Sequence, residues 1–395
     1  MKRWSGFLKK SSISTQFQFV HHEVSLNFMQ VKTKLAYLCS STSWGGLEMN
    51  HLRNAKWMLD RGHDILVIGI EGSPYHDYAK SLHLPFQVFP LYKKYFDFKA
   101  ARNLVLILEE NEVSHLLIRS TRDMSIVATV KRKMKNKLHT SYFMEMQLGV
   151  KKTGIGHTLR FKYIDLWSCP LHWLHDQVKT MTHFRNALVT IPSGVDLSAF
   201  QIPLTKVAAR EKLDLPANGN FVGLIGRFDP QKGQLLLLQA MDQCIHQDFS
   251  VVLLGEPTKN EGEHYYAEMK SIVEKKKDRV YVRPYRADIV TFYRAMDWIV
   301  MATKAETIGM VTIESLASGT PVLGSNAGGT PEILAGGKGG LLFESMNAKD
   351  LAEKIDEIFS TAVRYNPEEL QQLVQHFDHH AVCASVEKVL GITRA

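Results

Sequence analysis

The sequence is poor in cysteine, glycine and proline, and it lacks any long hydrophobic run. Its 395 residues include 4 cysteines, 26 glycines and 13 prolines. No Cys-x-x-Cys pair and no cluster at zinc-ligand spacing is present, which excludes a disulfide-stapled scaffold and predicts reduced core thiols at Cys39, Cys169, Cys244 and Cys383. No apolar stretch approaches the roughly 18 residues that cross a bilayer, so we expect no membrane-spanning helix.

Neither disorder nor a fibrous repeat fits the composition. Hydrophobic residues make up 45% of the chain and charged residues 22%, which is typical of globular proteins. A length of 395 residues predicts about two domains. Residues 1–30 begin with positive charge but hold no hydrophobic core of about 7 to 15 residues, so we interpret them as a leader of uncertain structure rather than a secretory signal. The cytoplasm is the expected location.

The positive charge is concentrated in the first half of the chain. The net charge is +8, but residues 1–200 hold 27 Lys and Arg against 15 Asp and Glu, whereas residues 201–395 hold 21 against 25. This asymmetry predicts an anionic partner for the first half: nucleic acid, an acidic lipid surface or a phosphorylated substrate. The basic residues within 131–137 and 151–162 are either a solvated face or a contact for anionic lipid on the inner face of the cell membrane.

Two alternations of apolar strands and amphipathic helices predict two parallel sheets. In the first, a strand at 35–39, a helix at 47–59 and a strand at 65–70 form a βαβ unit. The second begins with a strand at 221–226. Between them, Pro192 and its neighbouring glycine suit a hinge, so we place the domain boundary there. The further predicted elements are strands at 115–118, 141–144, 250–254, 280–282, 298–301, 321–324 and 341–343 and helices at 125–135, 234–244, 289–295 and 311–318.

The most informative stretch is residues 304–322, which places Glu306 and Glu314 eight positions apart with Gly309 between them. Glu306 falls in the loop that leaves a strand, and Glu314 falls about one turn into the next helix. Loop amides and a helix N-terminus attract anions, so this segment predicts a cradle for a diphosphate with one glutamate on either side. A nucleotide sugar fits, because its hexose and ribose hydroxyls flank the diphosphate.

A second segment supports this interpretation. Residues 226–233 read Gly-Arg-Phe-Asp-Pro-Gln-Lys-Gly and follow the first strand of the second sheet, at the edge where open α/β sheets bind ligands. Arg227 offers a forked donor and Lys232 a point charge, which together suit a leaving diphosphate. Taken singly, each cation would be an ordinary surface residue.

Together with Gly45-Gly46-Leu47-Glu48, Ile191-Pro192-Ser193-Gly194 and Gly328-Gly329-Thr330-Pro331-Glu332, these segments resemble the retaining glycosyltransferases of family 4. The resemblance implies an α/β protein of the GT-B fold, with two doubly wound Rossmann-like domains facing a central cleft. It implies an acceptor-binding domain at 31–192, a nucleotide-sugar-binding domain at 193–375 and, at 376–395, a C-terminal helix that returns to the first domain.

The resemblance also assigns site residues. The implied catalytic residues are Arg227, Lys232, Glu306 and Asp123. The implied donor-binding residues are Gly45, Gly46, Gly226, Gly309, Met310, Val311 and Glu314. The chain departs from the family pattern at Thr307, where glycine is usual, and at Arg119–Asp123, where many members carry a histidine. We expect Arg122 and Asp123 to face the cleft instead, and His115 to lie within a strand.

We expect neither a metal nor a cofactor. The chain has no D-x-D pair with which to chelate a metal on a diphosphate, so cations and backbone amides would neutralise that charge. The histidine pairs at 21–22 and 379–380 lack a third ligand nearby in sequence, and we interpret them as structural or surface residues. The glycines around Lys338 lack the complete phosphate-loop pattern, so we interpret 336–340 as a tight turn.

The resemblance therefore implies a retaining hexosyltransferase, and the missing D-x-D pair predicts that it needs no metal. Its expected partners are a nucleoside-diphosphate sugar as donor, a glycan or lipid-linked envelope or capsule polysaccharide precursor as acceptor, and an anionic membrane surface met through the first domain; nucleic acid is not expected. Two alternatives stay open. One is a GT-B nucleotide-sugar epimerase or phosphorylase, and the other is a basic nucleic-acid-binding protein.

Overall fold

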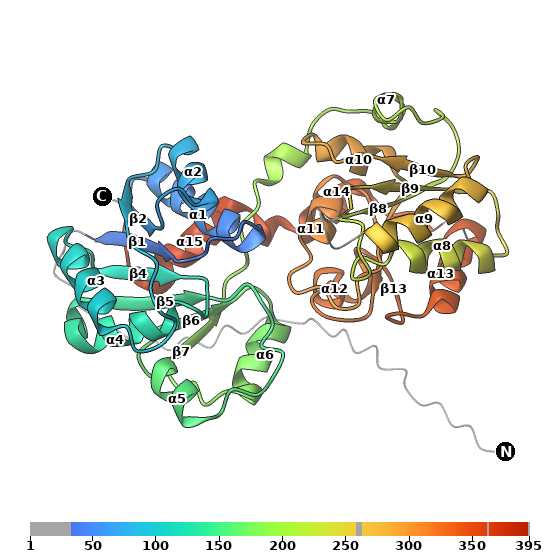
Figure 1. The fold of residues 1–395 in the computed structure, drawn as a ribbon. Helices are drawn as coiled ribbons and strands as arrows, with labels where there is room; N and C mark the ends of the chain where they lie inside the picture. Colours follow the sequence, from blue (N-terminus) through green and yellow to red (C-terminus); the bar gives the residue numbers. More distant parts are fainter. Residues whose placement is uncertain (1–32, 258–262, 362, 394–395) are drawn as a thin grey trace, which may run out of the picture. The chain divides into compact units, whose positions relative to one another are not determined.

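The computed structural model describes residues 33–257, 263–361 and 363–393 (Figure 1). The proposed leader and the histidine pair His21–His22 lie outside the described residues. Strands are parallel in both sheets, and helices connect them, which is the arrangement that alternating strand and helix patterns predict. The two sheets are the cores of two Rossmann-like domains.

The first sheet has seven strands in the order β3-β2-β1-β4-β5-β6-β7. The interior strand at Lys34–Cys39 is buried on both faces, because helices cover both sides of a parallel sheet. The strands are β1 (Lys34–Cys39), β2 (Asp64–Gly69), β3 (Phe86–Val88), β4 (His115–Ile118), β5 (His139–Phe143), β6 (Leu166–Cys169) and β7 (Ala187–Thr190). The helices of this part are α1 (Gly46–Asp60), α2 (Pro74–Ser81), α3 (Phe98–Glu110), α4 (Met124–Met134), α5 (Ile155–Phe161) and α6 (His172–Met181).

The C-terminal helix α15 (His379–Leu390) packs into the same hydrophobic cluster as β1 and α1. Its Glu387 accepts hydrogen bonds from Arg61 Nε at 2.8 Å and Arg61 Nη2 at 2.6 Å, and it lies 2.9 Å from His63 Nε2. Arg61 and His63, which directly follow α1, thus anchor the C-terminal helix α15 through Glu387. The Arg61 contact lowers the pKa of Glu387 to about 2.

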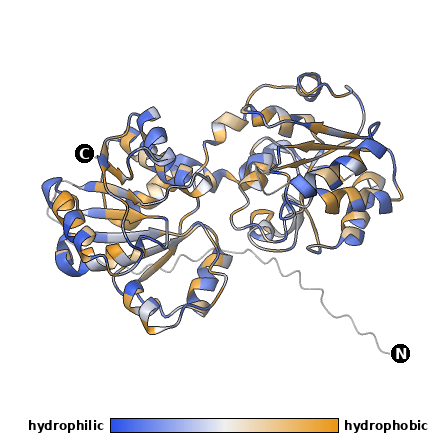
Figure 2. Ribbon diagram, in the orientation of Figure 1, coloured by the Kyte–Doolittle hydropathy of each residue, from blue (hydrophilic) through white to orange (hydrophobic). Residues whose placement is uncertain are grey.

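The second sheet has six strands in the order β10-β9-β8-β11-β12-β13. Figure 2 shows its strands mostly in the colours of hydrophobic residues. The strands are β8 (Phe221–Ile225), β9 (Ser250–Leu254), β10 (Val280–Arg283), β11 (Trp298–Met301), β12 (Val322–Ser325) and β13 (Gly340–Phe343). The helices are α7 (Lys206–Glu211), α8 (Gln234–Gln243), α9 (Glu263–Lys275), α10 (Ile289–Ala295), α11 (Met310–Ala317), α12 (Thr330–Ile333), α13 (Ala348–Ser360) and α14 (Pro367–Leu373).

The predicted strands and helices are confirmed to within two residues at each end. The 336–340 segment is a turn before β13, as predicted. All four cysteines are buried and free, and burial raises the pKa of each thiol, so they are inert core residues. Among the helices of the described segments, none has the length and hydropathy needed to cross a bilayer.

Candidate functional site

The loop between β8 and α8 holds Lys232 over a glycine. Gly226 has φ +152°, and a Cβ there would lie 3.2 Å from Lys232 Cγ, so only glycine lets the lysine stem pack this closely. The loop is tied from within, because Gln234 Nε2 donates to the Arg227 carbonyl at 2.9 Å and the Gln234 side-chain oxygen accepts from Tyr265 at 3.0 Å. The loop therefore presents the Lys232 ammonium in a fixed place at the carboxyl edge of the sheet.

The loop between β11 and α11 brings Glu306 to the same place. Glu306 pairs as an isolated bridge with Gly328, and the Gly329 N–H donates to the Glu306 carbonyl at 2.8 Å. These contacts fix the backbone of the loop. The Glu306 carboxylate then lies 3.3 Å from Lys232 Nζ, with both side chains between a fifth and a third exposed. Two residues 74 positions apart thus form one accessible ion pair.

Gly309 begins α11 as its N-cap. Its φ is +79°, and a Cβ there would come within 2.9 Å of Ile333 Cδ1, so both backbone angle and space require glycine. Met310 and Val311 follow in the first turn, where backbone N–H groups have no partner within the helix. This turn is the anion-attracting end of α11 that the sequence predicted, and it begins shortly after Glu306.

Glu314 lies further along α11 and is held from α10. Tyr293 Oη donates to its carboxylate at 2.7 Å. Burial raises the pKa of Glu314, and this hydrogen bond opposes the shift. The tyrosine itself is fully buried, so the Glu314 carboxylate has a rigid partner on one side.

Arg227 stands apart from the Lys232–Glu306 pair. Its side chain is 67% exposed, and its one ion pair within the described residues is a long one to Asp229 at 3.7 Å. It lies on the same loop as Lys232, so it is placed to reach an incoming anion rather than held against Glu306.

Gly45 and Gly46 lie in the first domain, where they begin α1. Gly45 is the N-cap and Gly46 the first helical residue, and a Cβ added at Gly46 would meet no atom within 4 Å, so the space beside it is open. The first-turn Glu48 is buried, and a Cβ at Gly45 would lie 3.6 Å from its Oε2. The Gly-Gly turn therefore leaves the N-terminus of α1 accessible at the carboxyl edge of the first sheet.

The prediction that Asp123 faces the cleft is wrong. Instead of facing an open cleft, its side chain is fully buried at the N-cap of α4. Its Oδ1 accepts hydrogen bonds from the Ser40 hydroxyl and from Tyr92 Oη, the latter at 2.5 Å. Burial raises the pKa of Asp123 to about 6. Arg122 is likewise turned inward in part, since its Nη2 donates to the Tyr92 carbonyl at 3.1 Å.

Sequence reasoning missed a buried ion pair at the same edge of the first sheet. Arg119, directly after β4, pairs with Glu145, which follows β5, and both are less than a tenth exposed. Glu145 also accepts from Ser193 Oγ at 2.9 Å and faces Asn50 Nδ2 at 3.4 Å. Burial lowers the pKa of Arg119 to about 10. A charged residue shortly after each of two adjacent parallel strands was the available signal.

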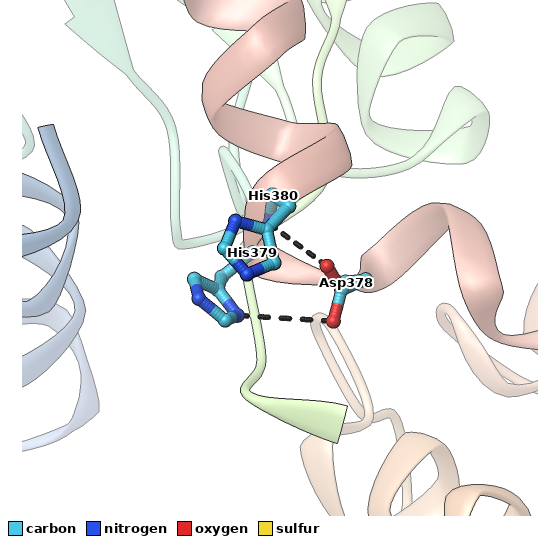
Figure 3. Close-up of side chains that lie close together, drawn as sticks. All are labelled: Asp378, His379 and His380. Atoms are coloured by element: carbon cyan, nitrogen blue, oxygen red, sulfur yellow. Dashed lines mark hydrogen bonds and ion pairs between the residues drawn. The ribbon is translucent and has the colours of Figure 1, made fainter. Parts of the chain in front are cut away.

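The second histidine pair has a third potential ligand, contrary to expectation. Asp378, His379 and His380 place one donor atom each within 4.8 Å of one another (Figure 3). The Asp378 carboxylate already caps α15, because it accepts from the His380 N–H at 2.9 Å. The His379 ring packs against Trp57, with 4.9 Å between ring centroids. These contacts give the cluster a structural task at the start of α15.

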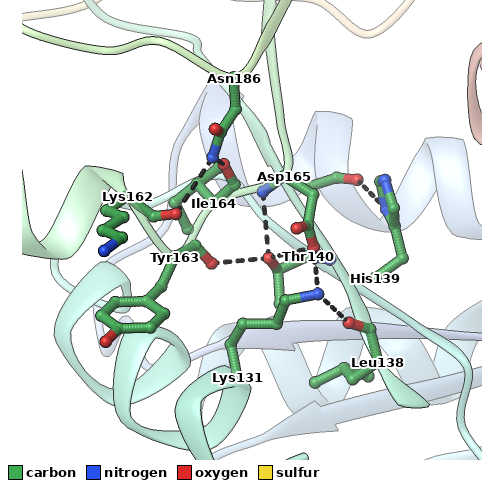
Figure 4. A network of polar contacts seen from close by, with 10 residues as sticks. Lys131, Leu138, His139, Thr140, Lys162, Tyr163, Ile164, Asp165 and Asn186 are labelled. Carbon is green, nitrogen blue, oxygen red and sulfur yellow. Dashed lines mark hydrogen bonds and ion pairs between the residues drawn. The ribbon is translucent and has the colours of Figure 1, made fainter. Parts of the chain in front are cut away.

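The basic run at 131–137 is also less free than its sequence suggests. Lys131 donates to the Leu138 carbonyl at 2.5 Å and pairs with Asp165 at 2.7 Å (Figure 4). Asp165 in turn accepts from the N–H of Thr140 at 2.8 Å and from its hydroxyl at 3.0 Å. Lys131 is therefore part of a network that joins α4, β5 and the segment before β6, and it is not available as a solvated cation.

Residues 206–375 match the family model described as glycosyl transferases group 1. The D-inositol 3-phosphate glycosyltransferase of Segniliparus rotundus is 34% identical over 163 residues, which cover 39% of this chain and 35% of that protein. Spore coat protein SA of Bacillus subtilis is 32% identical over 193 residues, which cover 45% of this chain and 51% of that protein. The matches thus span between a third and about half of the curated relatives.

The fold is also found in solved structures. The Anabaena protein HepE, in a crystal structure with UDP, has a TM-score of 0.79 at 20% identity, covering 91% of this chain and 100% of that chain. A sucrose-phosphate synthase from Thermosynechococcus elongatus has a TM-score of 0.70 at 17% identity, covering 91% of this chain and 98% of that chain. The resemblance drawn from the motifs is confirmed at the level of the fold and of the match: the chain has the GT-B fold, and its residues 206–375 are similar to the group 1 glycosyltransferases.

Proposed function

We propose that this protein is a retaining glycosyltransferase that moves a sugar from a nucleoside diphosphate to a glycan or lipid-linked precursor of an envelope or capsule polysaccharide. One observation carries the proposal: Lys232 and Glu306 form an accessible ion pair beside the N-terminus of α11. A cation and a helix N-terminus suit a diphosphate, and a neighbouring carboxylate suits sugar hydroxyls.

The relatives support a nucleotide-sugar donor. The name of the Segniliparus relative is that of a glycosyltransferase, and the family match covers the part of this chain that includes both loops. The HepE structures contain UDP, UDP with glucose, or UDP-glucose. We propose that the second domain of this chain binds a donor of the same chemical class.

In the proposed mechanism, the chain's own groups neutralise the departing diphosphate. The first-turn amides of α11, Lys232 and the exposed Arg227 would meet the phosphate oxygens. Glu306 would accept hydrogen bonds from the hexose and hold its anomeric carbon toward the acceptor. Glu314, held by Tyr293, would accept from the ribose. The departing phosphate oxygen would take the proton of the acceptor hydroxyl, so that no enzyme carboxylate attacks the sugar.

The acceptor is proposed to meet the carboxyl edge of the first sheet. That edge carries the open Gly45-Gly46 turn and the buried Arg119–Glu145 pair. Because Asp123 is buried against Ser40 and Tyr92, we propose for it a positioning role in which it fixes the loop that precedes the Gly-Gly turn. A cytoplasmic location, with peripheral attachment to the inner membrane face, belongs to the same proposal.

The test begins with a thermal-shift panel of nucleoside diphosphates and their sugars, because a ligand at 100 times its Kd stabilises by about 2.7 kcal/mol. The donor found is then incubated with candidate glycan acceptors. We expect release of the nucleoside diphosphate that depends on acceptor and a product with the donor's anomeric configuration. Conversion of the nucleotide sugar without acceptor would make the protein an epimerase, a requirement for free phosphate would make it a phosphorylase, and either result would overturn the proposal.

A further inference from the structure

Two segments of the first domain expose an unusual share of hydrophobic side chains. Eight of the seventeen large hydrophobic side chains that are exposed in the described part of the chain lie within 91–98 and 146–159. Of these eight, Phe96 at 85% and Ile155 at 81% are the most exposed. Single exposed hydrophobic residues are ordinary, but a cluster marks a surface that binds a partner. The eight are Leu91, Tyr95, Phe96, Phe98, Met146, Val150, Ile155 and Leu159.

The two segments meet at Tyr95. The first connects β3 to α3, and the second leads into α5 (Figure 1). The Arg160 guanidinium of the second segment lies 5.2 Å from the centroid of the Tyr95 ring, and the Lys94 ammonium lies 5.3 Å from the same ring. Residues 91–99 and 146–162 therefore form one surface, which we call the apolar–basic surface.

The charge of the apolar–basic surface is almost entirely positive. Its one acidic residue, Asp97, is occupied as the N-cap of α3, where it accepts from the N–H groups of Ala100 at 3.0 Å and Lys93 at 3.1 Å. Against it stand seven cations: Lys93, Lys94, Lys99, Lys151, Lys152, Arg160 and Lys162. Cations around exposed hydrophobic side chains match a bilayer interface, where lipid phosphates surround an apolar interior.

Phe96 is presented outward by its backbone. Its φ is +56°, in the left-handed region that bulky residues rarely adopt. This strained conformation puts the most exposed aromatic side chain of the surface directly before the N-cap of α3. Strain of this kind is characteristic of binding sites, because a sequence selected for stability alone would place glycine or asparagine there.

We propose that the apolar–basic surface docks the protein on an anionic lipid bilayer, with Phe96, Ile155 and Leu159 entering the headgroup region. The proposal rests on the proposed function and deepens it by naming the surface through which a lipid-linked acceptor is reached. Lipid fits better than nucleic acid, because the aliphatic Ile155 and Leu159 offer no face on which bases stack. The run at 131–137 fits less well, because its one large hydrophobic residue, Met134, is buried.

The test is co-sedimentation of the full chain with vesicles and needs no sugar transfer, so its failure is separate from failure of the proposed activity. We expect binding to vesicles of phosphatidylglycerol and phosphatidylcholine, release near 0.5 M salt, and little binding to phosphatidylcholine alone. The triple variant Phe96→Ser, Ile155→Ser and Leu159→Ser should bind the vesicles at least tenfold more weakly. Burial of even one such side chain in the bilayer interface strengthens binding by about tenfold or more. Its matched control replaces Tyr285, Ile245 and Val207, exposed 66%, 84% and 56%, with serine and should bind as wild type.

A second pair of variants locates the charge contribution. Replacing Lys94, Lys151 and Lys162 with glutamine should weaken binding by about fivefold for each cation, whereas replacing Arg132, Lys133 and Lys135 should change it little. Wild-type binding by the Phe96 triple variant would overturn the proposal. An equal loss in the Arg132 triple variant would move the contact to the basic run and also overturn it. Binding of random-sequence RNA that needs the same lysines but not Phe96 would make this a nucleic-acid surface instead.

Discussion

The Lys232 ammonium lies 3.3 Å from the Glu306 carboxylate, and the two residues come from loops that follow neighbouring strands of the second sheet. Under the proposed function, this pair would let a carboxylate stay beside a bound diphosphate. Without a cation between them, Glu306 and the phosphates would repel each other. Lys232 would reduce that repulsion, and its ion pair orients the Glu306 side chain.

Glu314 should matter for donor affinity more than for folding. Replacing Glu314 with glutamine removes the charge but keeps the shape, and we expect the donor to bind about tenfold more weakly. Because burial raises the pKa of Glu314, the variant should unfold at the same temperature as wild type or higher near pH 8. Calorimetric titration and thermal unfolding measure the two effects. A variant that loses stability but keeps its affinity would assign Glu314 a structural role.

Tyr293→Phe tests the same site from the other side. The Tyr293 hydrogen bond holds the pKa of Glu314 down against burial, so its loss should raise that pKa further. If the ionised carboxylate binds the ribose, donor affinity should decline with falling pH, and this decline should begin at a higher pH in Tyr293→Phe. Superimposable affinity profiles for the two proteins would contradict the account.

Transfer should not need a divalent ion. The absence of a D-x-D pair and the presence of Lys232, Arg227 and the α11 N-terminus predict full activity in excess EDTA. Assays with EDTA, and with added magnesium or manganese after chelation, check this. Activity that disappears on chelation and returns with either ion would be the opposite of the expected result.

Asp123 should make stability depend on pH. Burial raises its pKa from 3.8 to about 6, so its contribution to stability is complete below about pH 4 and is lost as the pH rises through about 6. Asp123→Asn removes this titration. Between about pH 4 and pH 7 the free energy of unfolding of the wild type should fall by about 2 kcal/mol relative to the variant. Urea unfolding of both proteins at the two pH values tests this, and a constant difference would contradict it.

Many of the strands and their parallel arrangement could be predicted, because buried parallel strands read as short hydrophobic runs such as Phe221–Ile225 and Trp298–Met301. The two loops that carry Lys232 and Glu306 could be predicted as well, since their glycines and charges are adjacent in sequence. The contacts of Arg119 and Asp123 in the first domain could not. Arg119 and Glu145 each follow a predicted strand, which is a signal, but neither segment by itself shows that the two side chains meet.

The solvent exposure of charged side chains was the other property that the local sequence could not predict. In the polar segment 119–123, the sequence gives Asp123 and the neighbouring arginines the same expected exposure. The Asp123 carboxylate is nevertheless buried, because it accepts hydrogen bonds from Ser40 and Tyr92, which lie 83 and 31 positions away. Lys131 looks like its neighbours in a basic run, yet Asp165 holds it. In both cases the partner that decides the role comes from a distant part of the chain.

The most direct measurement of the central claim is calorimetric titration of the preferred nucleoside diphosphate into the wild type, Lys232→Ala and Lys338→Ala. Lys338 is the matched control, because it is an exposed lysine in a glycine-rich turn of the same domain. We expect Lys232→Ala to weaken binding at least tenfold and to lower turnover by a factor of about 100, with Arg227→Ala showing a loss of turnover of similar order. Lys338→Ala should match the wild type. Unchanged binding by correctly folded Lys232→Ala, or an equal loss in Lys338→Ala, would contradict the assignment of this site to the diphosphate.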